Sequence, residues 1–145
     1  MHVREIMTAD PTCCGPETSL QEVAKMMADE DCGCLPVVDK NMKPVGTITD
    51  RDITVRAVAK GRNPLDLTAE DCMTSQVISV SKDADLDECC RLLEDNQLRR
   101  LLVVDESGGC CGIVAQADIA RKASEKVSGD LVKEVSKPTA SASSA

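Results

Sequence analysis

The chain has no Phe, Tyr or Trp among its 145 residues, and its only histidine is His2. Without aromatic rings it cannot stack nucleic-acid bases on aromatic platforms or enclose a cation in an aromatic cage. The sequence also contains no Ser-His-Asp set, P-loop or paired-carboxylate motif. We therefore expect a non-catalytic protein with an aliphatic core and no catalytic residues.

Long apolar runs are missing as well. No stretch approaches the roughly 20 apolar residues of a membrane span, and the N-terminus lacks the basic-then-apolar plan of a signal peptide. The 17 Lys and Arg against 25 Asp and Glu give a net charge of -8, which opposes general attraction to nucleic acid or anionic membranes. We expect a cytoplasmic globular protein that binds neither nucleic acid nor membrane.

An internal repeat organises the chain. Met7-Thr8 recurs as Met73-Thr74, an offset of 66 residues. At this offset, without any gap, 12 of the 47 pairs between residues 7–53 and 73–119 are identical, where unrelated sequences would share roughly three. The sequence therefore contains a duplicated unit.

The duplication divides the chain into copy 1 at residues 1–62, copy 2 at residues 63–127, and a C-terminal tail with a disordered end at residues 128–145. A copy of this size buries too little surface to be stable alone. We therefore expect the two copies to fold as one unit.

Each copy is predicted to contain a helix, two buried strands joined by turn residues, and a second helix. The segment from Thr18 to Gln21 is typical of a capping box, and the helix that follows carries an apolar stripe at Leu20, Val23, Ala24 and Met27. The equivalent stripe in copy 2 includes Cys89 and Cys90, which favours core packing for these two thiols. The strands are expected at residues 35–39 and 45–48 in copy 1, and at 101–105 and 111–114 in copy 2.

This tandem β-α-β-β-α pattern resembles the CBS domain pair over residues 3 to 123. The motifs that carry the resemblance are LPVVD and PVGTITDRDI in copy 1, and CGIVAQADI in copy 2. The chain is most similar to short bacterial proteins that consist of a single CBS pair, of the stress- or hypoxia-response kind. The resemblance implies an α/β fold in which two pseudo-twofold-related motifs enclose two clefts, and it implies a homodimer of such pairs.

The resemblance also implies a function. Clefts of related pairs bind adenosine-containing ligands, so the expected ligand is AMP, ADP, ATP, S-adenosylmethionine or NAD, with no cofactor required. The chain is then a regulatory module in signal transduction that passes its ligand state to an unknown protein partner. The alternatives are a ligand-free dimerisation or partner-binding scaffold, and a cysteine-based redox or zinc sensor.

The family's ligand signature corresponds to Gly46–Asp52 here. By resemblance, Asp52 accepts hydrogen bonds from ribose hydroxyls and Thr49 holds a phosphate. The same two residues have the spacing of a capping box, and both interpretations stay open. In copy 2 the aspartate is retained as Asp118, but Ala115 replaces the hydroxyl. An aspartate without its capping partner favours a ligand role, although its charge in the first helical turn is also a sufficient explanation.

Arg99 and Arg100 precede the first strand of copy 2. In related pairs a basic residue at this point reaches ligand phosphates in the cleft that includes the aspartate of the same copy, here Asp118; alternatively, the two arginines mark the exposed end of the strand. By resemblance, Thr12, Gly33 and Cys34 complete the Asp118 cleft, and Ile78 and Leu98 belong to the Asp52 cleft. One cleft then has Thr49 and Asp52, whereas the other has Arg99, Arg100 and Asp118 but lacks the hydroxyl. Because of this asymmetry we expect at most one strongly bound nucleotide per chain.

The nine cysteines are interpreted mostly as small buried hydrophobic residues. Cys13-Cys14 and Cys32-Gly33-Cys34 do not have the CxxC spacing of structural zinc sites, and no metal site is assigned. A thiol sensor requires an accessible cysteine with a lowered pKa, which is a property of the folded chain.

Overall fold

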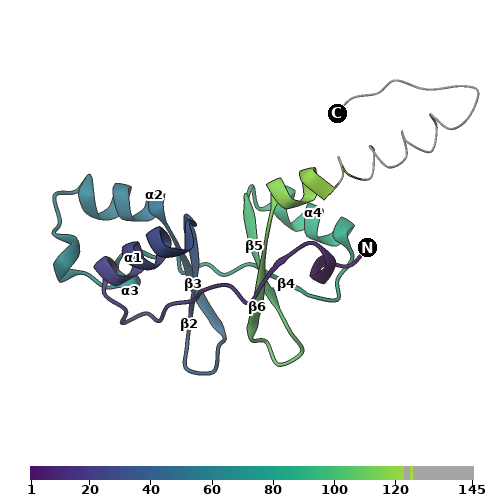
Figure 1. The fold of residues 1–145 in the computed structure, drawn as a ribbon, viewed down its shortest axis with the longest axis horizontal. Helices are drawn as coiled ribbons and strands as arrows, with labels where there is room; N and C mark the ends of the chain where they lie inside the picture. The colour runs from purple at the N-terminus through teal and green to yellow at the C-terminus, as the bar shows by residue number, and fades with distance from the viewer. Residues whose placement is uncertain (123–124, 126–145) are drawn as a thin grey trace, which may run out of the picture.

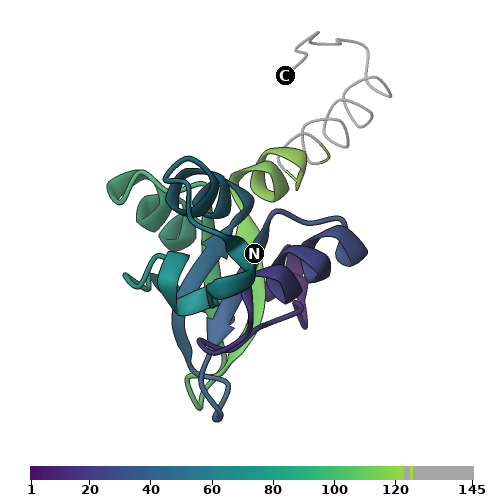
Figure 2. The same cartoon turned by 90° about the vertical axis from the view of Figure 1, so that its left-hand side faces the viewer.

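The computed structural model describes residues 1–122 and residue 125; the predicted tail at 128–145 lies outside this part of the chain. Two α/β halves lie side by side, with their strands toward the middle of the molecule and their labelled helices on the outer sides (Figure 1). The α/β class expected from the sequence is confirmed. The hairpin turns of both halves lie at the same end of the molecule (Figure 2).

The two repeats contain matching elements. Copy 1 contains the helix α1 (Leu20–Glu30), the hairpin β2 (Cys34–Val38) and β3 (Pro44–Thr49), and the helix α2 (Asp50–Ile53), which continues as a π-helical turn (Thr54–Val58). Copy 2 contains β4 (Ser79–Ser81), α4 (Leu86–Asp95), β5 (Arg100–Val104), β6 (Cys110–Ala115) and a helix over 116–122. The segments that precede these units contain Val3–Glu5 and β1 (Thr8–Ala9) in copy 1, and Pro64–Asp66 and α3 (Ala69–Cys72) in copy 2.

The start of α1 differs by one residue from the prediction. Ser19, rather than Thr18, caps the helix, and its hydroxyl accepts a 3.2 Å hydrogen bond from the Glu22 N–H. The Thr18 hydroxyl accepts from the Gly15 N–H instead, at 3.0 Å. The expected apolar stripe is narrower than predicted, because Ala24 is exposed while the buried side chains of α1 are Leu20, Val23 and Met27.

The repeats exchange their N-terminal segments. β1 of copy 1 pairs antiparallel with β6 of copy 2, with Thr8 opposite Ile113, in a sheet of order β1-β6-β5-β4. The equivalent residue of copy 2, Thr74, pairs antiparallel with Thr47 on β3 of copy 1. Each sheet therefore pairs with a segment from the other copy, through the strand β1 in the sheet of copy 2 and through the single bridge at Thr74 in the sheet of copy 1.

The hydrophobic cores follow the same exchange. Val3, with Ile6 and Met7 beside it, packs into the core of copy 2, which is built around Leu101 and Val103. Conversely, Leu67, Ala69 and Cys72 pack into the core of copy 1, around Leu35 and Ile48. The packing units thus differ from the sequence repeats, because each core contains residues from both copies.

Two equivalent glycines allow the exchanged segments to approach closely. A Cβ atom on Gly46 would lie 2.7 Å from the carbonyl oxygen of Thr74, and one on Gly112 would lie 2.5 Å from the sulfur of Met7. Since Cβ contacts below 3.0 Å do not occur without displacement, a side chain at Gly46 would push the Thr74 backbone away. At Gly112 the flexible Met7 side chain would have to move, and the Thr8 carbonyl oxygen would lie 3.1 Å from the new Cβ.

All nine cysteines are free thiols; five are buried and four are half-buried. Cys89 packs in the core of copy 2, and burial raises the pKa of its thiol to about 11. Cys90 is half-buried on the same helix. In the part of the chain that the structure describes, no helix has the length and apolar character needed to span a membrane.

The exchange predicts how glycine substitutions act. Gly46→Ala should lower the free energy of unfolding by about 1–3 kcal/mol, because the new methyl group displaces the Thr74 backbone. Gly112→Ala should have a smaller effect, because the flexible Met7 side chain can move away from the methyl group. Gly109→Ala is the control, since its Cβ would lie no closer than 3.5 Å to the nearest atom. Scanning calorimetry should show one transition, lowered only in the first two variants. Two separate transitions would contradict folding as one unit.

Candidate functional site

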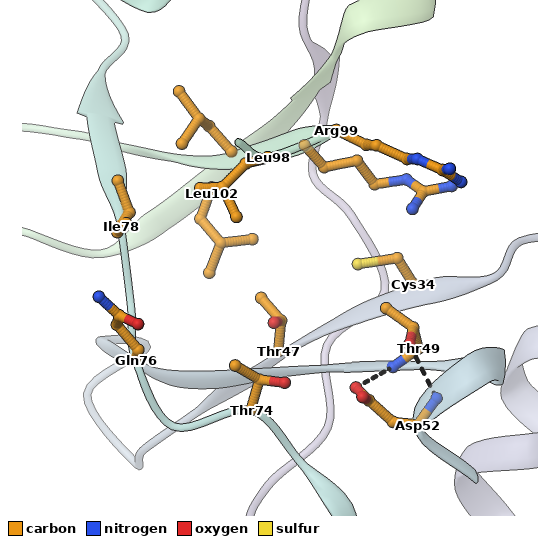
Figure 3. A pocket seen from close by; sticks show the side chains of 12 residues that line it. Cys34, Thr47, Thr49, Asp52, Thr74, Gln76, Ile78, Leu98, Arg99 and Leu102 are labelled. Carbon is orange, nitrogen blue, oxygen red and sulfur yellow. Dashed lines mark hydrogen bonds between the residues drawn. The ribbon is translucent and has the colours of Figure 1, made fainter. Parts of the chain in front are cut away.

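Two clefts lie between the repeats, each containing one of the two signature aspartates. The first, the Asp52 cleft, has a volume of about 220 Å³. Its lining residues come from both copies (Figure 3): Cys34, Thr47, Thr49, Asp52, Thr74, Gln76, Ile78, Leu98, Arg99, Arg100, Leu101 and Leu102.

The second, the Asp118 cleft, has a volume of about 550 Å³. It is lined by Thr8, Ala9, Asp10, Pro11, Thr12, Glu30, Asp31, Cys32, Gly33, Cys34, Leu35, Arg100, Ile113, Ala115 and Asp118. Eleven of the twelve residues of the Asp52 cleft have their equivalent, at the offset of 66, in this second cleft. The two clefts are therefore the same site, duplicated with the sequence.

Asp52 forms the capping box that its spacing predicts. Its Oδ2 accepts a 3.0 Å hydrogen bond from the Thr49 N–H, and the Thr49 hydroxyl accepts one of 3.0 Å from the Asp52 N–H. The other carboxylate oxygen, Oδ1, lies 3.9 Å from Nε of Arg56, and the Asp52 side chain is 15% exposed. Asp52 thus caps α2 with one oxygen and keeps the second for a further hydrogen bond.

Asp118 makes the same backbone contact without the hydroxyl. Its Oδ2 accepts a 2.9 Å hydrogen bond from the Ala115 N–H, and its Oδ1 lies 2.6 Å from a guanidinium nitrogen of Arg121. Asp118 therefore makes the capping contact although Ala115 supplies no hydroxyl, because the carboxylate alone is sufficient to accept from the N-cap N–H. Both of its oxygens are engaged by the chain itself.

The position of Arg99 corrects the sequence analysis. Arg99 lines the Asp52 cleft, not the Asp118 cleft to which it was assigned. The reason is symmetry: Gly33 is the repeat equivalent of Arg99, and it lies in the Asp118 cleft. Arg100 and its equivalent Cys34 line both clefts, which places this pair between them.

The remaining predicted residues lie in the expected clefts. Ile78 and Leu98 line the Asp52 cleft, and Thr12, Gly33 and Cys34 line the Asp118 cleft. Sequence reasoning missed several polar lining residues, which are Thr47, Thr74 and Gln76 in one cleft and Asp10, Glu30 and Asp31 in the other. The repeated Met-Thr dipeptide was a usable signal for Thr74, because it marks equivalent segments in the two copies.

The clefts differ in charge. One carboxylate, Asp52, and two guanidinium groups, Arg99 and Arg100, line the Asp52 cleft, for a net charge of +1. The Asp118 cleft has Arg100 against four carboxylates, for a net charge of -3; these are Asp10, Glu30, Asp31 and Asp118. Only the Asp52 cleft has the sign that attracts a phosphate.

The charged and the aliphatic groups of the Asp52 cleft lie at different ends, with the polar Gln76 beside Ile78 (Figure 3). Ile78, Leu98 and Leu102 gather on one side, while the Arg99 guanidinium lies toward the end that holds Thr49 and Asp52 (Figure 3). The thiol of Cys34 lies near this polar end, and burial raises its pKa to about 11, so it is neutral at pH 7. The cleft can therefore take a ligand with an apolar body and an anionic, hydroxyl-bearing end.

Residues 3–58 and 69–125 match the family model of the CBS domain. The chain belongs to the CBS domain family. It is 35% identical over 140 residues to hypoxic response protein 1 of Mycobacterium tuberculosis, covering 97% of each chain. It is also 36% identical to the uncharacterized protein MK0525 of Methanopyrus kandleri. The 116 aligned residues make up 80% of this chain and 57% of that relative.

Solved structures share the fold. Hypoxic Response Protein I with two coordinated zinc ions has a TM-score of 0.76 at 35% identity, covering 83% of this chain and 98% of that one. The CBS domain pair of MJ0100 with 5′-methylthioadenosine and S-adenosyl-L-methionine has a TM-score of 0.77 at 30% identity. The match covers 87% of this chain and 98% of that one. CBSX2 in complex with AMP has a TM-score of 0.73 at 26% identity, and the match covers 87% of this chain and 98% of that one.

Capping by Asp118 predicts the effect of two substitutions at this residue. Asp118→Ala should lower the free energy of unfolding by about 0.5–2 kcal/mol, because the Ala115 N–H loses its acceptor. Asp118→Asn should retain most of that stability, since the amide oxygen still accepts the bond. Chemical denaturation followed by far-UV circular dichroism measures both. Equal losses in the two variants would show that the charge, not the hydrogen bond, stabilises the helix.

Proposed function

We propose that the chain is a non-catalytic regulatory module that binds an adenine nucleotide in its Asp52 cleft. The observation that carries this proposal is that Thr49, Asp52 and Arg99 lie toward one end of a cleft that Arg100 also lines, while Ile78, Leu98 and Leu102 lie on its other side. AMP bound to CBSX2, and the adenosyl ligands bound to the MJ0100 pair, support this class of ligand.

The chemistry of each group suits one part of a nucleotide. The Oδ1 of Asp52 lies 3.9 Å from Arg56 Nε, beyond hydrogen-bond distance, so it can accept from a ribose hydroxyl, as carboxylates do in many nucleotide sites. The two guanidinium groups bind phosphate oxygens through charge-assisted hydrogen bonds, and their planar form allows bidentate contact. Ile78, Leu98 and Leu102 provide the apolar surface on which a base is desolvated.

The Asp118 cleft is proposed to exclude phosphorylated ligands. Its four carboxylates repel a phosphate, and Ala115 provides no hydroxyl. This assignment gives one nucleotide per chain, within the limit of at most one expected from the sequence, and places it in the Asp52 cleft. Binding is then transmitted by a change in the relative placement of the two copies, to the extent that one placement binds the ligand better.

Thermal unfolding with added ligand tests the proposal, using calorimetry because the chain has no aromatic fluorophore. AMP, ADP or ATP at roughly 100 times its Kd should add about 2.7 kcal/mol of stability and raise the Tm by several degrees. Adenosine, which lacks the phosphate, should give a smaller shift. S-adenosylmethionine and NAD are added in separate unfolding measurements as further candidate ligands. A complete absence of shifts would favour a ligand-free scaffold.

Two matched variants locate the site. Arg99→Gln should weaken nucleotide binding about tenfold or more, because it removes a charge-assisted contact to phosphate. Arg91→Gln on α4 is the control, since Arg91 is exposed and lines neither cleft. Titration calorimetry of folded protein measures both affinities. Equal affinity in the two variants would refute the proposed role of Arg99.

A homodimer is the second part of the proposal. Val55 and Val58 on the helical turn after α2 are 42% and 60% exposed, and such apolar side chains are typical of a self-complementary contact. Sedimentation equilibrium should give twice the 15.5 kDa chain mass, and Val58→Asp should shift the chain toward the monomer. Met42→Asp at the β2–β3 turn, on the end away from α2 (Figure 1), should leave the dimer unchanged.

Zinc binding is the alternative that the comparisons favour, because the solved Hypoxic Response Protein I holds two zinc ions. Within residues 1–122 and at residue 125, no group of three or more His, Cys, Asp or Glu side chains is placed to hold a metal ion. The same relative, by its name, supports a role in the response to stress. Zinc content of the purified protein, measured by atomic absorption, distinguishes this alternative from nucleotide binding.

A further inference from the structure

Two cysteines from different repeats meet at the start of β6. Ala9 of β1 pairs with Gly112 of β6, and the Asp10 N–H donates a 3.0 Å hydrogen bond to the Cys111 carbonyl. The next step along this antiparallel ladder places residue 11 beside Cys110. Cys13 turns back toward this point, because its thiol donates a 3.3 Å hydrogen bond to the Pro11 carbonyl. The antiparallel register and this turn therefore place the Cys13 thiol beside Cys110, and each thiol is the largest influence on the pKa of the other.

A β-bulge turns Cys110 away from the core of its own repeat. Val103 pairs with Gly112 but Val104 pairs with Cys110, so Cys111 is the extra residue and packs against the core of copy 2. The Cys110 N–H donates a 2.8 Å hydrogen bond to the carbonyl of Met42, which belongs to copy 1. Met42 also lines a surface hollow together with Cys13. Cys110 is therefore held against copy 1, at Cys13.

The two neighbouring cysteines face elsewhere. Cys14 is buried in the core of copy 1, and Cys111 packs on the core of copy 2. The repeat equivalents of Cys13 and Cys110 are Ser79 and Pro44, so the thiol pair occurs once in the duplicated fold. The contact between Cys13 and Cys110 is therefore a feature of this chain's side chains and not of the symmetric scaffold.

We propose that Cys13 and Cys110 form a reversible disulfide that joins the segment before α1 to the start of β6. The bond links the two repeats through two cysteines that are 97 positions apart in the sequence. It also holds residues 10–12, which form one wall of the Asp118 cleft. The proposal goes beyond nucleotide binding and is independent of it.

The oxidant is a small-molecule disulfide such as glutathione disulfide. The Cys13 thiolate attacks one sulfur of the oxidant, the oxidant's S–S bond breaks, and one thiolate leaves and takes up the proton from Cys13. Cys110 then attacks the Cys13 sulfur of the mixed disulfide, and a second thiolate leaves and takes up the Cys110 proton. Two cysteine thiols are thereby oxidised while one disulfide is reduced to two thiols.

The environment assigns the roles of the two thiols. Cys13 is half-buried and can be reached by the oxidant, whereas Cys110 is buried. The hydrogen bond between the thiols lowers the pKa of Cys13 below its ordinary value and, together with burial, raises the pKa of Cys110. Cys13 is thus the attacking thiol and Cys110 the resolving thiol.

Peptide mapping of the full chain tests the proposal. The protein is incubated with glutathione disulfide, its remaining thiols are alkylated, and it is digested with trypsin. We expect a reducible cross-link between the peptides 5–25 and 101–121 in a chain that stays a single polypeptide on a non-reducing gel. Absence of this cross-link, or a cross-link only between chains, would overturn the proposal.

Single variants identify the two sulfurs, because each peptide contains a vicinal pair. Cys13→Ser and Cys110→Ser should abolish the cross-link, whereas Cys14→Ala and Cys111→Ala should retain it. Cys13→Ser is the decisive variant, since its half-buried position tolerates the change. Oxidation should raise the wild-type Tm by roughly 5–10 °C and leave the Tm of Cys13→Ser unchanged. A cross-link that survives Cys13→Ser would refute the pairing.

Discussion

The exchange of N-terminal segments between the two repeats is the contact on which the rest of the molecule depends. Thr8 completes the sheet of copy 2, and Thr74 pairs with the hairpin of copy 1. Gly46 and Gly112 leave the space in which the exchanged segments lie. Because each segment then runs on along the boundary between the copies, it supplies one wall of a cleft, so the same exchange builds the cores and both candidate sites.

A symmetric scaffold leaves only side chains to distinguish the two clefts. Arg99 in one cleft corresponds to Gly33 in the other, and Thr49 corresponds to Ala115. Four acidic side chains line the Asp118 cleft, among them Glu30 and Asp31 from the end of α1, whereas Asp52 is the one acidic residue of the described chain that lines the Asp52 cleft. The result is one cleft suited to an anionic ligand and one that repels it, in two repeats that contain matching helices and strands.

Much of this organisation could be predicted from the sequence. The duplication, the α/β class and the capping box of Thr49 and Asp52 all follow from local patterns, and the structure confirms them. The exchange could not be predicted, because the pairing of β1 with β6 joins residues about 100 positions apart that no local pattern connects. The cleft of Arg99 was predicted wrongly, although its equivalence with Gly33 was visible in the repeat and requires opposite clefts.

The contacts of the cysteines, like the exchange of segments, could be predicted only in part from the sequence. Composition predicts that most are buried, which the structure bears out, but it does not show that Cys13 lies against Cys110 across the boundary between the repeats. That contact depends on the exchange and on a bulge in β6, and both are properties of the folded chain.

The central claim is that the charge of the Asp52 cleft selects it for a phosphorylated ligand. Amide chemical shifts of isotopically labelled protein during an AMP titration test this claim residue by residue. The account predicts saturable shifts at Thr49, Asp52 and residues 98–100, with the amides of Thr12 and Asp118 unchanged. Shifts confined to Thr12 and Asp118, or no saturable shifts at all, would contradict it.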